Sequence, residues 1–121
     1  MRLYPETPYD YAAAAGELVF TAGACPLDEN GDVVGGGLDA QAHAALDNLL
    51  SVLDRESSSI DRILKTTVYV ATDDREQLVR AWRIVEERLA PARPPSTLVG
   101  VSVLGWPGQL FEIEAIARKG A

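Results

Sequence analysis

The sequence contains few of the residues that several common kinds of site require. Its 121 residues include one cysteine, Cys25, and one histidine, His43. A single cysteine excludes an internal disulfide, and neither side chain has a Cys or His neighbour at the spacing of a metal site. One histidine also leaves little for a Ser-His-Asp triad. His43 falls at a polar position of a predicted helix, so we expect it to face solvent.

Lysine is scarce as well. Only Lys65 and Lys119 occur, and the nine arginines are scattered along the chain. The formal net charge is -7 and the isoelectric point is near 4.6. Because a phosphate backbone is bound by clustered cations, this charge disfavours nucleic acid as the main ligand.

Long apolar runs are absent too. None approaches the ~20 residues of a membrane span, and residues 1–20 lack the pattern of a secretory signal. We therefore expect a cytoplasmic protein with no membrane association. The composition, 47% hydrophobic and 24% charged, is typical of soluble proteins. The length predicts a single domain over residues 1–121.

The order of predicted elements is ββαβαββ. Turn residues and β-formers predict a hairpin, with strands near 9–13 and 18–22. Apolar residues at steps of three and four predict a helix over 38–55, with Asp39 as its N-cap. A β-branched run predicts an interior strand over 63–70, and residues 72–74 are expected to cap a second helix that prolines end from position 91. Two more strands are predicted over 97–103 and 110–117, joined through a turn at 106–108.

This order predicts an α+β fold in which one sheet carries two helices on the same face, since each helix has a single apolar stripe. In the last strand, alternation predicts which side chains face the helices: Phe111, Ile113, Ala115 and Ala117. It predicts the opposite direction for Leu110, Glu112, Glu114 and Ile116. A half-apolar open face is a liability in a monomer. We therefore expect a homo-oligomer with rotational symmetry and pockets where neighbouring sheets meet.

Four stretches carry a resemblance to a known family. They are Pro8-Tyr9, residues 19–23 followed by Pro26, residues 41–49, and the strand ILKTTVYV at 63–70 together with the tail EIEAIA at 112–117. In this order, over nearly the whole chain, they closely resemble the reactive intermediate deaminase family, also called Rid or YjgF. The resemblance implies a chorismate-mutase-like fold and a homotrimer with three small-molecule clefts between subunits. It also implies hydrolysis of enamines or imines to a 2-keto acid and ammonia, with no metal or other cofactor.

The resemblance implies site residues as well. Tyr9 matches a tyrosine of the cleft, Gly23 a residue whose carbonyl helps to hold the attacking water, and Glu112 a carboxylate that positions that water. Leu98 matches a position that offers its backbone N–H. Where active relatives have an arginine that binds the substrate carboxylate through two parallel bonds, this chain has Ser96.

Ser96 at this position predicts an altered substrate class. Arg93 lies three residues earlier, before two prolines that restrict its path, and is a poor substitute. Losing a buried charge-assisted contact costs about 2–5 kcal/mol. We therefore expect Ser96 and Tyr9 to contact a neutral or aromatic molecule rather than an amino-acid-derived carboxylate.

Several alternatives stay open at this stage. The favoured interpretation of Cys25 is a small buried residue, and the alternative is a thiol that lines the cleft. Trp106 either covers a neighbour's cleft or packs locally. Glu112 taken alone is more often a solvated or interface residue than a general base, and the resemblance to the family makes the two interpretations about equal. For the protein as a whole, the alternative to a deaminase is a non-catalytic trimeric metabolite-binding or regulatory protein. Ribonuclease activity, attached to some relatives, is disfavoured by the net charge and the lack of a histidine pair.

Overall fold

The computed structural model describes residues 2–120. Its elements follow the predicted order ββαβαββ, with one short 3-10 helix, η1, inserted before the third strand. They are β1 (Ala12–Ala15), β2 (Leu18–Thr21), α1 (Gly37–Arg55), η1 (Ile60–Arg62), β3 (Ile63–Ala71), α2 (Arg75–Leu89), β4 (Ser96–Val101) and β5 (Phe111–Arg118).

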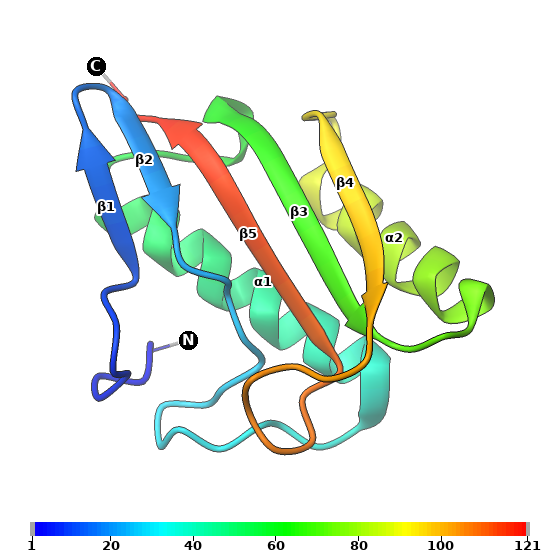
Figure 1. Cartoon of the computed structure of the whole chain (residues 1–121). Coiled ribbons are helices and arrows are strands. Elements are labelled where there is room, and N and C mark those ends of the chain that lie inside the picture. Colours follow the sequence, from blue (N-terminus) through cyan, green and yellow to red (C-terminus); the bar gives the residue numbers. More distant parts are fainter. Residues whose placement is uncertain (1, 121) are drawn as a thin grey trace.

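The five strands form one sheet in the order β1-β2-β5-β3-β4. β3 and β4 are parallel and are joined through α2, whereas the other neighbouring pairs are antiparallel. Both helices cover the same face of the sheet (Figure 1). The predicted α+β architecture is therefore confirmed, and β3 is an interior strand as expected.

The core lies between this covered face and the two helices. All four β5 side chains predicted to face the helices are buried: Phe111, Ile113, Ala115 and Ala117. They pack against the apolar stripe of α1, whose Leu46, Leu49 and Leu53 are fully buried. The periodicity of the sequence thus predicted both sides of the core correctly.

The other face of the sheet is open in the single chain. Glu112, Glu114 and Ile116 of β5 are half-buried there, and Phe20 of β2 is 43% exposed. The Tyr69 hydroxyl donates to Glu114 Oε1 at 2.7 Å across the β3–β5 pair. This face is apolar in part and carries paired polar groups, as predicted.

The predicted N-cap of the first helix is wrong. The N-cap is Gly36, whose φ of 98° lies in the left-handed region that glycine adopts without strain. Asp39 instead lies in the first turn, where both of its oxygens accept from Arg80 of α2 at 2.7 and 2.8 Å. The second helix begins as predicted, because the Asp74 carboxylate caps it by accepting from Glu76 N at 2.9 Å.

The boundaries of β1 and β4 differ from the predicted ones because neighbouring strands decide where each strand begins and ends. β1 begins three residues later than expected, because its register with β2 runs from Ala12↔Thr21 to Ala15↔Leu18 around a tight turn at Gly16. β4 ends at Val101 rather than at 103, because its only partner, β3, ends at Ala71. Within residues 2–120, no helix combines the length and apolar character needed to cross a membrane.

Two isoleucines on opposite faces of β5 test this assignment. Ile113→Ala is expected to lower the free energy of unfolding by about 2–5 kcal/mol, because it opens a cavity in the core. Ile116→Ala, on the open face, is expected to cost under about 1 kcal/mol in the separate chain. Urea denaturation at several protein concentrations measures both. A small cost for Ile113→Ala would contradict the core, and a cost for Ile116→Ala that grows with concentration would show that another copy covers the open face.

Candidate functional site

Gly23 and Glu112 meet where the chain leaves β2. Residue Ala24 forms an isolated antiparallel bridge with Ile113, with hydrogen bonds of 2.6 and 3.2 Å in the two directions. This bridge holds Gly23 against the side chain of Glu112. A Cβ atom on Gly23 would lie 2.1 Å from Glu112 Oε2, so any side chain there would collide with the carboxylate.

The two oxygens of Glu112 have different surroundings. Oε1 accepts from Gln109 Nε2 at 3.1 Å and from the Cys25 thiol at 3.4 Å. The same thiol lies 3.4 Å from the carbonyl oxygen of Gly23. No donor among residues 2–120 is bonded to Oε2, which faces Gly23. The carboxylate is therefore held through one oxygen and available through the other.

Cys25 is a small buried residue, as the favoured interpretation of the sequence expects. It is buried, with 8% exposure, and its thiol still contacts Glu112. Burial, followed by the charge of Glu112 and the hydrogen bond to it, raises the pKa of Cys25 to about 12. At neutral pH the thiol is protonated, so it is a hydrogen-bond donor rather than a nucleophilic thiolate.

Tyr9 lies beside this group, in the segment that precedes β1. Its side chain is 39% exposed and meets the ring of Tyr11 edge-on at 6.3 Å. Partial burial, followed by the proximity of Cys25, raises the pKa of Tyr9 to about 12, while an interaction with Trp106 lowers it. Trp106 also meets the Tyr4 ring edge-on at 6.4 Å. Within one chain, Trp106 therefore packs locally against the N-terminal segment.

Three buried carboxamides hold the loops that form the site. Gln109 accepts from Trp106 N at 3.1 Å and donates to Phe111 O at 3.0 Å. Gln41 of α1 donates to Gly108 O at 3.0 Å and accepts from Leu110 N at 2.7 Å.

The third carboxamide, Asn48 of α1, holds the other loop by donating to the carbonyl oxygens of Cys25 and Leu27 at 2.8 and 2.9 Å. The part that these three residues play in supporting the loops was not predicted from the sequence. A signal existed, however, because Gln41 and Asn48 interrupt the apolar stripe of the first helix.

Ser96 and Leu98 are not brought to this group. Both lie on β4, which β3 separates from β5. The Ser96 hydroxyl faces the helix layer, where it contacts Thr66 Oγ1 and the Pro94 carbonyl oxygen. Leu98 packs against the core. Within a single chain, the five predicted site residues form two separate groups.

The backbone of Leu98 nevertheless has an accessible position. β4 is an edge strand, and Thr66 N donates to Pro95 O at 2.9 Å. In a parallel ladder the bonded residues alternate. The peptide groups of residues 95, 97 and 99 therefore face β3, and the Leu98 N–H faces outward from the free edge of the sheet.

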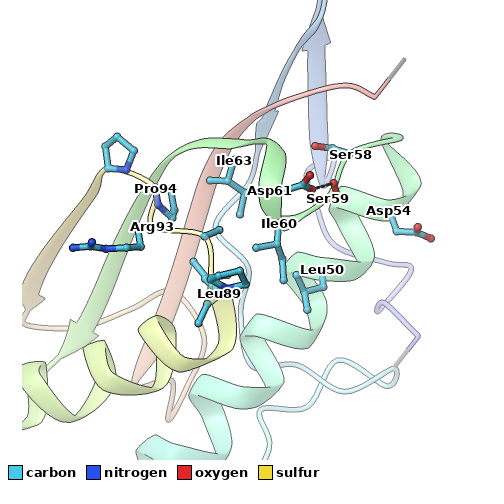
Figure 2. Close-up of a pocket in the computed structure, with 14 residues that line it drawn as sticks. Leu50, Asp54, Ser58, Ser59, Ile60, Asp61, Ile63, Leu89, Arg93 and Pro94 are labelled. Carbon is cyan, nitrogen blue, oxygen red and sulfur yellow. Dashed lines mark hydrogen bonds between the residues drawn. The ribbon is translucent and has the colours of Figure 1, made fainter.

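A larger pocket lies elsewhere. It has a volume of about 840 Å³ and lies where the C-terminal ends of both helices meet η1 and the loop before β4. Figure 2 shows apolar side chains such as Leu50 and Ile60 in it, with Arg93 extending away from them. None of the five predicted site residues lines this cavity. Ser96 and Arg93 share the lining of a smaller pocket of about 210 Å³ beside Trp82 and Glu86.

The sequence and the fold match a known family. A sequence model described as Endoribonuclease L-PSP matches residues 1–119, and the chain belongs to this family, which solved relatives also name Rid and YjgF. A RutC family protein of Pyrococcus horikoshii is 33% identical over 116 residues, which cover 95% of this chain and 90% of that protein.

Solved structures agree. The Yersinia pestis protein YyfA, described as a Rid-family protein of unknown function, is 27% identical with a TM-score of 0.83, over 92% of this chain and 87% of that one. E. coli TdcF, solved with bound serine, is 25% identical with a TM-score of 0.77, over 95% and 91% of the two chains.

The pairing of Glu112 with Cys25 predicts a titration that two matched variants separate. Glu112→Gln is expected to lower the pKa of Cys25, because it removes the negative charge that opposes thiolate formation. Glu114→Gln is expected to leave the pKa of Cys25 unchanged and to lower that of Tyr69, which is raised to about 12 chiefly by its hydrogen bond to Glu114. Ultraviolet absorbance of thiolate and tyrosinate, followed against pH while the chain stays folded, measures both. Equal effects of the two variants on Cys25 would contradict the geometry.

Proposed function

We propose that the protein binds a small molecule in clefts between the subunits of a homotrimer and hydrolyses an enamine or imine there. The observation that carries this proposal is the Glu112 carboxylate, fixed through Oε1 and open at Oε2 beside Gly23. Such a group can accept a proton from a water molecule that the Gly23 carbonyl oxygen also holds.

Hydrolysis of an imine at this site needs no reactant other than water. Water adds to the carbon of a protonated imine while Glu112 takes one of its protons. Glu112 then passes this proton to the amino group of the carbinolamine, the C–N bond breaks to release ammonia, and the hydroxyl proton returns to Glu112, so that a neutral carbonyl compound remains. Tyr9 and the Leu98 N–H would bind the ligand as hydrogen-bond donors. Because Tyr9 and Cys25 keep their protons at neutral pH, both can donate throughout.

The separation of the two groups of site residues supports the oligomer. The Glu112 group lies at the start of β5, and the free edge of β4 lies on the far side of β3. A cleft that contains both groups requires two copies, one contributing each group. The half-apolar open face of the sheet gives those copies a surface to bury.

The proposed substrate class follows from the side chain of Ser96. The Ser96 hydroxyl is already bonded within its own chain, and it brings no charge. We infer that the ligand is neutral or aromatic rather than an amino-acid-derived carboxylate. The serine molecule bound in the structure of E. coli TdcF supports small-molecule binding by this fold. The nucleolytic activity in the family's description is not favoured here, because the net charge is -7 and two arginines, Arg80 and Arg88, are bonded to Asp39 and Asp47.

The alternative proposal is a non-catalytic trimer that binds a metabolite or regulates a partner. It predicts thermal stabilisation by a ligand without turnover. The two proposals are separated by Glu112→Ala. Loss of a measurable hydrolysis, with ligand binding retained, would exclude the non-catalytic function.

The oligomeric state is the first test. We expect sedimentation equilibrium and native mass spectrometry to give three times the chain mass of 13.0 kDa. A monomer at all concentrations would contradict the cleft, since no single chain brings the two groups together.

Ser96→Arg tests the substrate class. We expect this variant to gain hydrolysis of enamines generated in place from amino acids, because a guanidinium restores a charge-assisted contact worth about 2–5 kcal/mol, roughly thirtyfold or more in affinity. Semicarbazone formation follows the reaction. The matched control is Ser96→Arg combined with Glu112→Ala, which is expected to be inactive. Equal rates for Ser96→Arg and buffer would contradict the alignment of this position.

A further inference from the structure

Among residues 2–120, Gln109 is the one residue whose side chain bonds both to Glu112 and to the backbone of the loop before β5. Its side chain is 4% exposed. The carbonyl oxygen accepts from Trp106 N at 3.1 Å, and the two amide hydrogens go to Phe111 O at 3.0 Å and Glu112 Oε1 at 3.1 Å. A carboxamide turned by 180° would place its oxygen against two acceptors and its NH₂ against a donor. Its orientation is therefore fixed by its partners.

This bond determines which oxygen of Glu112 is available. Oε1 has two donors, and of these the amide N–H is stronger than the Cys25 thiol. With Oε1 held by Gln109, the plane of the carboxylate is set and Oε2 faces Gly23. Without Gln109, the thiol would be the one remaining hydrogen-bond donor to the carboxylate among the described residues.

We propose that Gln109 is the positioning residue of Glu112, and that it couples the conformation of the Trp106 loop to the orientation of the water-binding carboxylate. This inference rests on the proposed function, in which Glu112 Oε2 accepts the proton of the attacking water. Trp106 contacts Tyr4 and interacts with Tyr9. A ligand that moves Tyr9 or Trp106 therefore moves Gln109, and through it Glu112.

A purely structural role for Gln109 is the competing explanation, and the chain contains its control. Gln41 is another buried glutamine, also 4% exposed, and it makes hydrogen bonds to the same loop at Gly108 and Leu110. It does not bond to Glu112. Gln41→Leu and Gln109→Leu both remove a buried carboxamide that supports the loop, but only the second removes a donor to the carboxylate.

The experiment compares these two variants as folded, full-length protein. The substrate is the neutral or aromatic imine, generated in place and carrying no carboxylate, that the wild type hydrolyses fastest. For Gln109→Leu we expect kcat to fall by about ten- to a hundredfold, as for other residues that orient a reacting group, with KM changed by less than about threefold. For Gln41→Leu we expect kcat within about threefold of the wild type, even if its melting temperature falls as much as that of Gln109→Leu. Equal loss of kcat in both variants would overturn the proposal.

A crystal structure of each variant separates this inference from the proposed function. If Oε2 of Glu112 still faces Gly23 in Gln109→Leu, positioning by Gln109 is refuted, whatever the wild type hydrolyses. If the carboxylate rotates in Gln109→Leu and not in Gln41→Leu, positioning is supported even where no enamine is hydrolysed, and the proposed function alone fails. Gln109→Met serves in both measurements if the leucine variant does not fold, because its unbranched side chain fills a similar volume without a donor.

Discussion

The site depends on the close approach of two backbone segments at Gly23 and Glu112. The bridge between Ala24 and Ile113 extends the sheet by one isolated pair beyond the end of β2. That pair holds the backbone of residue 23 where no side chain fits, and it places the carbonyl of Gly23 and the carboxylate of Glu112 together. A main-chain oxygen and a side-chain oxygen thereby become neighbours, although 89 positions separate the two residues in the chain numbering.

Buried carboxamides make this approach rigid. A buried polar group costs free energy unless its hydrogen bonds are made. Gln109 and Asn48 use both of their amide hydrogens on backbone or site oxygens. The loops that carry Cys25 and Trp106 are thus fixed by side chains from the core rather than by regular secondary structure. Displacing either loop would leave a buried amide unpaired, which favours the conformation that these irregular segments have here.

The sequence predicted the fold better than it predicted the site, for a physical reason. Hydrophobic periodicity is local, so the helices, the strands and the buried face of β5 followed from spacing alone. Hydrogen bonds such as that between Gln41 and Leu110 join residues far apart in the chain, and no local pattern encodes them. The resemblance to the family led to Tyr9, Gly23 and Glu112, which the structure brings together.

The direction of the Ser96 side chain could not be predicted, because the strand STLVGV has no clear alternation of apolar and polar residues. Parallel pairing with β3 decides it, and places the Ser96 hydroxyl beside Thr66. The N-cap was mispredicted for a similar reason. Three consecutive glycines allowed the chain to enter the helix one residue earlier, and a partner on α2 engaged Asp39.

The charges that remain in the site favour one kind of reacting molecule. Glu112 is the only charged side chain in its group, and the side chains around it that donate hydrogen bonds are neutral: the Tyr9 hydroxyl, the Cys25 thiol and the Gln109 amide. Within this group, a bound carboxylate would meet the negative charge of Glu112 with no cation beside it. In the proposed hydrolysis, a protonated imine would be positive at the carbon that water attacks, so the same carboxylate would attract it and accept the proton of the water. Under the proposed alignment, Ser96 in place of an arginine would remove attraction for the carboxylate of an amino-acid-derived ligand and leave the attraction for the reacting carbon.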